Sequence, residues 1–135
     1  MTSELKPEET AIQKIAQQVD TTWLTQGRIV VVGLGGIGSI LARYLVLFLA
    51  SLPDEFRVLL ADGDDFEPNN NYRMDVPAYN NKAVAMDAEL SERFGRDGLV
   101  IRSKGQYLKA ENKDDIIREG DFVLLCVDNH ATRKL

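Results

Sequence analysis

The chain has 135 residues, of which 44% are hydrophobic and 27% are charged, and its formal net charge is -5 at pH 7. This length is enough for one domain with a core of its own and too short for two. The negative net charge argues against general nucleic-acid binding, which needs a basic surface to displace counterions. Cys126 is the one cysteine, which excludes an internal disulfide and a structural zinc site of the Cys-x-x-Cys type.

The N-terminal ten residues are polar and acidic, which is not the pattern of a secretory signal peptide. The long apolar run from Ile37 to Leu52 contains Arg43 and is too short to span a bilayer. We therefore expect a cytoplasmic protein without a membrane partner.

The N-terminal segment, residues 1–27, is predicted to carry one amphipathic helix. Pro7, Glu8 and Glu9 are typical of a helix start. Apolar residues then follow at helical spacing, namely Ile12, Ile15, Ala16 and Val19. Such a helix would either pack on the domain or serve as a dimer arm, and the sequence leaves both interpretations open.

Residues 28–135 are predicted to form a Rossmann-like nucleotide-binding domain. Residues 29–32 are a continuous β-branched run, which is typical of a strand buried on both faces of a parallel sheet. After a glycine-rich turn, apolar residues at helical spacing predict a helix that ends before Pro53; they are Ile37, Ile40, Leu41, Tyr44, Leu45 and Phe48. Residues 56–60 predict a second strand that leads into Asp62 and completes a βαβ unit.

Strands and helices continue to alternate along the rest of the chain. A polar region, residues 63–79, precedes a helix that is expected to begin at Asn80 or Asn81 and to end at Gly95. Its expected inward residues are Ala83, Met86, Leu90 and Phe94. Residues 99–101 predict a short strand, residues 112–119 a short helix capped by Asn112, and residues 122–127 a fourth, wholly apolar strand. We thus predict an α/β fold with a mostly parallel sheet and flanking helices, the first half of a doubly wound domain that is incomplete at its C-terminus.

The glycine loop from Gly33 to Gly38 lies where a phosphate-binding loop belongs, between a buried strand and a helix. We expect Gly33 to allow the tight turn, Gly35 to let phosphates approach the backbone, and Gly38 to let the helix pack close to the strand. The start of the helix would offer free N–H groups to a phosphate. Asp62, at the end of the second strand, would accept hydrogen bonds from a ribose. These features fit an NAD(P)-binding oxidoreductase domain as well as an ATP enzyme.

The polar segment after Asp62 favours ATP over NAD. Asn70 and Arg73 bring an amide and a guanidinium together, and Lys82 adds a second cation. Such groups neutralise the charge of a triphosphate that is being cleaved. Asp128 follows the fourth strand at the carboxyl edge of the sheet, where a carboxylate can hold Mg²⁺.

Together, these residues resemble the ThiF/MoeB/HesA family of adenylyltransferases, which is related to the ubiquitin-activating enzymes. The resemblance runs from about Arg28 to Arg133 and rests on four ordered pieces: residues 32–39, Asp62-x-Asp64 with Asn70-x-x-Arg73, Lys82, and residues 126–129 followed by Arg133. It implies that Mg-ATP is bound and that the C-terminal carboxylate of a ubiquitin-like or sulfur-carrier protein attacks the α-phosphorus. The products would be an acyl adenylate and pyrophosphate.

The resemblance also implies a role for each matched residue. Asp62 would hold the ribose, and Asn70, Arg73 and Lys82 would contact the phosphates. Asp128 would bind the magnesium ion and, with Arg73 and Lys82, would be catalytic. The full set of implied nucleotide-binding residues is Gly33, Gly35, Gly36, Gly38, Asp62, Asp64, Asn70, Arg73, Lys82 and Asp128.

Further expectations concern partners and the cysteine. Family members often dimerise, and an incomplete sheet leaves an apolar edge, so a homodimer is expected. Cys126 lies in an apolar strand and is expected to be a buried small hydrophobe, not a nucleophile. A non-catalytic interaction module that keeps the fold and has lost turnover remains an alternative.

Overall fold

All four strands of the sheet that the structure describes run parallel. The computed structural model describes residues 6–16, 25–65 and 81–127. In chain order the elements are α1 (Pro7–Ala16), β1 (Arg28–Val32), α2 (Gly36–Ala50), β2 (Phe56–Ala61), α3 (Lys82–Phe94), β3 (Leu99–Lys104), α4 (Lys113–Ile116) and β4 (Phe122–Leu125). The strands pair in parallel in the order β3-β2-β1-β4, which confirms the predicted Rossmann-like α/β fold. In the described part of the chain, no helix is long and apolar enough to cross a membrane.

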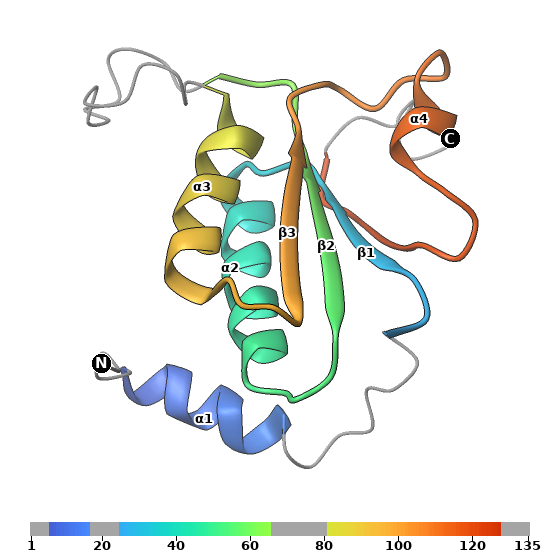
Figure 1. Cartoon of the computed structure of the whole chain (residues 1–135). Coiled ribbons are helices and arrows are strands. Elements are labelled where there is room, and N and C mark those ends of the chain that lie inside the picture. Colours follow the sequence, from blue (N-terminus) through green and yellow to red (C-terminus); the bar gives the residue numbers. More distant parts are fainter. Residues whose placement is uncertain (1–5, 17–24, 66–80, 128–135) are drawn as a thin grey trace.

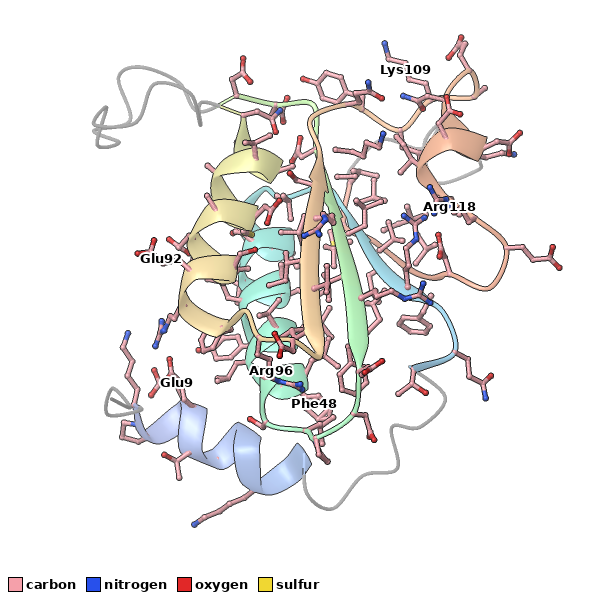
Figure 2. The ribbon with its side chains drawn as sticks, in the orientation of Figure 1. Glu9, Phe48, Glu92, Arg96, Lys109 and Arg118 are labelled. Atoms are coloured by element: carbon pink, nitrogen blue, oxygen red, sulfur yellow. The ribbon has the colours of Figure 1, made fainter. Side chains whose placement is uncertain are left out.

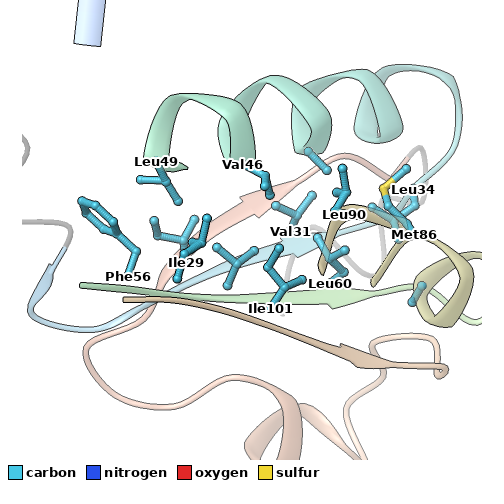
Figure 3. Close-up of a cluster of buried hydrophobic side chains, with 14 of the residues drawn as sticks. Ile29, Val31, Leu34, Val46, Leu49, Phe56, Leu60, Met86, Leu90 and Ile101 are labelled. Carbon is cyan, nitrogen blue, oxygen red and sulfur yellow. The ribbon is translucent and has the colours of Figure 1, made fainter. Parts of the chain in front are cut away.

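Helices cover both faces of the sheet (Figure 1). Helices α2 and α3 lie on one face, over a core to which β1 gives Ile29 and Val31 and β2 gives Phe56 and Leu60. Figure 3 shows side chains of α2 and α3 meeting those of the strands in this core. The alternate residues of β1, Val30 and Val32, form a second core on the other face. That second core is completed by side chains of β2 and of the segment around α4, namely Leu59, Ala61, Leu108 and Ile116.

The helix predicted from the apolar spacing after the glycine loop is present as α2, but the first residues of that spacing do not lie on its buried face. The helix instead buries Gly38, Ala42, Val46, Leu47 and Leu49. Four of the expected residues are exposed, namely Ile37, Ile40, Leu41 and Tyr44. Almost every position of this helix is apolar, so the sequence offers two faces of helical spacing. Close contact of Gly38 with the β1 end selects the face that packs on the sheet.

The fourth strand and the helix before it also depart from expectation. β4 ends at Leu125, before the predicted end at residue 127. Its Phe122 and Leu125 are exposed, because β4 lies at an edge of the described sheet and has one neighbour there, β1. Helix α4 is one turn long and ends at Ile116, well before residue 119. The Asn112 side chain does not cap it; its Oδ1 accepts a hydrogen bond from the backbone N–H of Lys109 instead.

Helix α1 contacts α2, and an ion pair links it to α3. Arg93 Nη2 donates to Glu9 Oε1 at 2.9 Å, and the guanidinium carbon lies 4.8 Å from the centroid of the Phe94 ring. Figure 2 shows Glu9 on the side of α1 that faces α3. This arrangement favours the packing interpretation of the N-terminal helix. The expected helix continuation through Val19 lies outside the described residues.

Helix α3 follows the prediction closely. It begins after Asn81, whose Oδ1 accepts hydrogen bonds from the N–H groups of Ala83 and Val84, and it is closed by Gly95. Ala83, Met86 and Leu90 are buried, and Phe94 packs against the core.

Candidate functional site at the carboxyl edge of the sheet

The glycine loop leaves the sheet at the point where the strand order reverses. In the sheet, β2 and then β3 lie on one side of β1, and β4 lies on the other side. Val32, the last residue of β1, is paired with Ala61 and Leu125, so the carboxyl ends of three strands meet there. Ligands of open α/β sheets bind in the crevice at such a switch point.

Two glycines of the loop stand where a side chain would collide with the backbone. Gly33 has a φ of +93°, a backbone conformation that residues other than glycine rarely adopt. A Cβ on Gly38 would lie 1.8 Å from the carbonyl oxygen of Gly33 and 3.1 Å from Cβ of Cys126. The first turn of α2 is therefore packed directly on the loop and on the residue that follows β4.

The other two glycines border open space. Among the residues that the structure describes, a Cβ on Gly35 or Gly36 would meet no atom within 4 Å outside its chain neighbours and its own helix. Gly35 is the N-cap of α2, and it has no side chain with which to cap the N–H groups of the first turn. These N–H groups cannot bond within the helix, and the helix dipole adds partial positive charge there. The space beside Gly35 and Gly36 is therefore suited to an anion such as a phosphate.

Asp62 fastens the glycine loop to the end of β2. Its side chain is buried, and Oδ2 accepts a hydrogen bond of 2.6 Å from the N–H of Leu34. Oδ1 accepts from the N–H of Asp64 at 2.8 Å. A carboxylate has about four acceptor positions, and these two bonds are the ones that the described residues make to it.

Asn81 links the start of α3 to the same turn. Besides capping the helix with Oδ1, it donates from Nδ2 to the carbonyl oxygens of Asp62, at 3.0 Å, and Asp64, at 3.2 Å. The N–H of Lys82 also donates to the Asp64 carbonyl, at 2.9 Å. The sequence predicted a helix cap at Asn80 or Asn81 and nothing more; the second role of Asn81 requires the tertiary contact between two loops.

Lys82 and Asp64 lie side by side at this edge. Lys82 Nζ is 4.0 Å from Asp64 Oδ2, and both side chains are partly exposed. The structure thus gathers the glycine loop, Asp62, Asp64 and Lys82 at one end of the sheet.

Tyr107 was not singled out from the sequence, yet it belongs to this cluster. Its hydroxyl donates to Asp64 Oδ1, and its ring lies against the backbone of Gly63. The hydrogen bond to Asp64, followed by desolvation and the negative charges of nearby aspartates, raises the pKa of the Tyr107 phenol above its ordinary value. The residue is a lone aromatic in a polar loop, and no sequence signal connects it to Asp64.

Three predicted site residues, Asn70, Arg73 and Asp128, lie outside the described residues. Their placement at this edge stays a prediction. Among the residues that the structure describes, no three side chains of metal-ligating type gather into one group.

Cys126 lies directly behind the glycine loop. It is half-buried and packs against the larger core, and its N–H donates to the carbonyl oxygen of Val32 at 2.7 Å. Burial raises the pKa of its thiol, which disfavours the thiolate needed by a nucleophile. These properties are those of a packing residue.

The sequence pattern of a known family matches residues 8–135; its description is the ThiF family. Two relatives from Zea mays, adenylyltransferase and sulfurtransferase MOCS3-1 and MOCS3-2, are each 33% identical to this chain over 112 residues. The match covers 82% of this chain but 23% and 22% of the two relatives. The chain therefore spans less than a quarter of the length of these relatives.

Solved structures share the same fold. PaaA has a TM-score of 0.58 at 18% identity, and the match covers 93% of this chain and 42% of PaaA. MccB from E. coli has a TM-score of 0.53, also at 18% identity, with coverage of 90% and 31%. At these identities the likeness concerns the architecture alone.

Proposed function

Because this chain belongs to the ThiF family, we propose that it is the ATP-binding part of an adenylyltransferase of the ubiquitin-activating type. The observation that carries the proposal is the bond from the Leu34 N–H to Asp62 Oδ2. It joins a loop suited to phosphate and a carboxylate suited to ribose into one rigid unit. The names of the Zea mays relatives, which include adenylyltransferase, support the same reaction class.

The described residues fit the sugar and the phosphates of ATP. The open space beside Gly35 and Gly36 admits a phosphate close to the N–H groups of the first turn of α2. Asp62 keeps acceptor positions for ribose hydroxyls after it has bonded Leu34 and Asp64. Lys82, the first residue of α3, supplies a positive charge at the same edge of the sheet.

In this proposal the protein acts by holding and orienting the nucleotide. The glycine loop and Asp62 fix the phosphates and the ribose before reaction, so that little ordering remains to be done in the transition state. Lys82 and Arg73 neutralise charge that develops on the phosphates, and Asp128 holds magnesium. Mg-ATP, when bound, would supply the α-phosphorus that the substrate carboxylate attacks, so that the adenylyl group passes to the carboxylate and pyrophosphate leaves.

The carboxylate substrate proposed is the C-terminus of a ubiquitin-like or sulfur-carrier protein. The relatives whose names combine adenylyl transfer with sulfur transfer favour a sulfur carrier. We expect an acyl adenylate and pyrophosphate as products. A cytoplasmic location and a homodimer are part of the same proposal.

Isothermal titration of the chain with Mg-ATP and with NAD tests the nucleotide. We expect heat of binding with Mg-ATP and none with NAD at equal concentration. Asp62→Ala should abolish binding, whereas Asp97→Ala should not, because Asp97 is exposed and lies on the turn between α3 and β3. Tight NAD binding without ATP binding would instead establish an oxidoreductase domain. Circular dichroism of each variant checks that a loss of binding is not a loss of fold.

Pyrophosphate exchange into ATP tests the reaction. With a carrier protein that ends in Gly-Gly, we expect exchange that depends on the carrier and is abolished by Arg73→Ala or Asp128→Ala. Binding of ATP without carrier-dependent exchange would favour the interaction module that has lost turnover.

A further inference from the structure

We propose that Tyr107 is a positioning residue that, through Asp64, holds the Lys82 amine in place for the phosphates of the nucleotide. The inference rests on the proposed function and adds to it a residue that acts through two others. Three side chains from separate parts of the chain form the series: Tyr107 after β3, Asp64 after β2, and Lys82 at the start of α3.

The loop that carries Tyr107 is fixed at its base. The backbone carbonyl oxygen of Tyr107 accepts a hydrogen bond of 2.8 Å from Asn112 Nδ2. Asn112 Oδ1 in turn accepts one of 2.8 Å from the N–H of Lys109. The next residue, Leu108, is buried in the second core. The backbone of Tyr107 is thus held on one side by Asn112 and on the other by the core.

The ring of Tyr107 is also fixed. A Cβ on Gly63 would lie 2.5 Å from two ring carbons of Tyr107, so the ring rests on the backbone of the Asp62–Asp64 turn. An exposed tyrosine normally exchanges among rotamers quickly. Contact with the turn limits that freedom and directs the hydroxyl at Asp64.

Asp64 connects the hydroxyl to the amine. Its Oδ1 accepts from the Tyr107 hydroxyl, and its Oδ2 lies 4.0 Å from Lys82 Nζ. The Asp64 side chain is about half exposed, and without the hydroxyl it would be free to rotate away. With Oδ1 held, Oδ2 stays directed at Lys82.

The ion pair is weak enough to yield to a nucleotide. Lys82 Nζ and Asp64 Oδ2 are 4.0 Å apart and both side chains are partly exposed, so water screens their attraction. The pair limits the positions of the Lys82 amine but contributes little binding energy. A triphosphate carries more charge and displaces Asp64 from the amine. Because Asp64 remains bonded to Tyr107, it neither follows the lysine nor approaches the phosphates.

A double-mutant cycle on Mg-ATP affinity tests the coupling. Tyr107→Phe should weaken binding about three- to tenfold, but it should have no further effect in a Lys82→Ala background. Tyr44→Phe, at an exposed tyrosine on α2, is the matched control and should change nothing. If Tyr107→Phe weakens binding equally with and without Lys82, Tyr107 acts on the nucleotide or on the fold, and the inference is wrong.

A second measurement needs no nucleotide. Reductive methylation followed by mass spectrometry reports the accessibility of each lysine, and Tyr107→Phe should increase labelling of Lys82 relative to Lys109. Unchanged labelling of Lys82 would overturn the inference even if ATP binds. Increased labelling in a protein that binds no ATP would support the positioning role and reject the proposed function.

Discussion

Arg28, at the start of β1, and Asp121, just before β4, form a two-point ion pair at the edge of the sheet opposite the candidate site. Nε lies 3.1 Å from Oδ1 and Nη2 lies 2.7 Å from Oδ2. Nη2 also donates to the Ile116 carbonyl oxygen, and the Arg118 N–H donates to Asp121 Oδ2. The Asp121 side chain is only 3% exposed. Figure 2 labels Arg118 on the loop between α4 and β4. The pair therefore fixes the amino end of β4 to β1.

Asp121→Asn should lower the free energy of unfolding by about 2–4 kcal/mol, because it leaves the part-buried Arg28 without its charged partner. Urea denaturation measures the change. Asp97→Asn, at an exposed site, is the control and should stay within about 0.5 kcal/mol of the original chain. Nucleotide affinity should be retained, since the pair lies at the far end of β1. If Asp121→Asn lowers the free energy of unfolding no more than Asp97→Asn does, the ion pair contributes little to stability.

The same pair predicts how stability depends on pH. Burial alone would raise the pKa of Asp121, but hydrogen bonds from Arg28 and from the Arg118 N–H, with the Arg28 charge, bring it below its ordinary value of 3.8. A lowered pKa in the folded state means that stabilisation is complete above the unfolded pKa and is lost as pH falls through the folded pKa. The difference in unfolding free energy between the original chain and Asp121→Asn should be constant near neutral pH. It should shrink below about pH 4. A difference that stays constant down to pH 2 would contradict this assignment.

Gly38→Ala and Gly36→Ala should separate packing from binding within one loop. The Cβ at position 38 meets the Gly33 carbonyl at 1.8 Å, so the variant should lose about 2 kcal/mol of stability or more. The Cβ at position 36 meets nothing, so that variant should be as stable as the original or up to about 1 kcal/mol more stable. Under the proposed function, Gly36→Ala should nevertheless weaken Mg-ATP binding, because its methyl group enters the space left for phosphate. Thermal denaturation and titration together measure both effects. Equal stability of the two variants would refute the packing role of Gly38.

The exposed apolar side chains of α2 bear on the expected homodimer. Ile37 is 80% exposed and Ile40 57% exposed, and Leu41 and Tyr44 lie on the same helix. Such a group of apolar side chains favours association. If a homodimer uses this face, Ile40→Glu should convert it to a monomer in sedimentation velocity without lowering stability. Sedimentation of the unaltered chain as a monomer at all concentrations would reject the homodimer.

The sequence predicted most of the fold because the signals were local. The run from Ile29 to Val32 predicted a buried parallel strand, which is confirmed. The capping preference of asparagine predicted a start of α3 at Asn80 or Asn81, and the structure selects Asn81. The orientation of α2 was not predictable in this way, since nearly all its residues are apolar and periodicity cannot choose between two faces.

Part of the candidate site could be predicted from the sequence for a similar reason. Asp62 and the glycine loop follow strands, and the carboxyl ends of parallel strands meet. Tyr107 and the second role of Asn81 depend on how the loops after β2 and β3 lie against each other, and residue types along the chain do not encode that contact.

The strand order has a consequence for how this protein folds. Paired residues in β1 and β2, such as Arg28 and Arg57, are 29 positions apart, whereas Ile29 of β1 and Phe122 of β4 are 93 apart. Closing the longer loop costs more chain entropy, and in the described sheet β4 gains hydrogen bonds to one neighbour, β1, to offset that cost. We therefore expect β1, β2 and the bond from Leu34 to Asp62 to form early, while the chain is still being synthesised, and β4 to dock last. Native-state hydrogen exchange should then show faster opening in β4 than in β1 or β2.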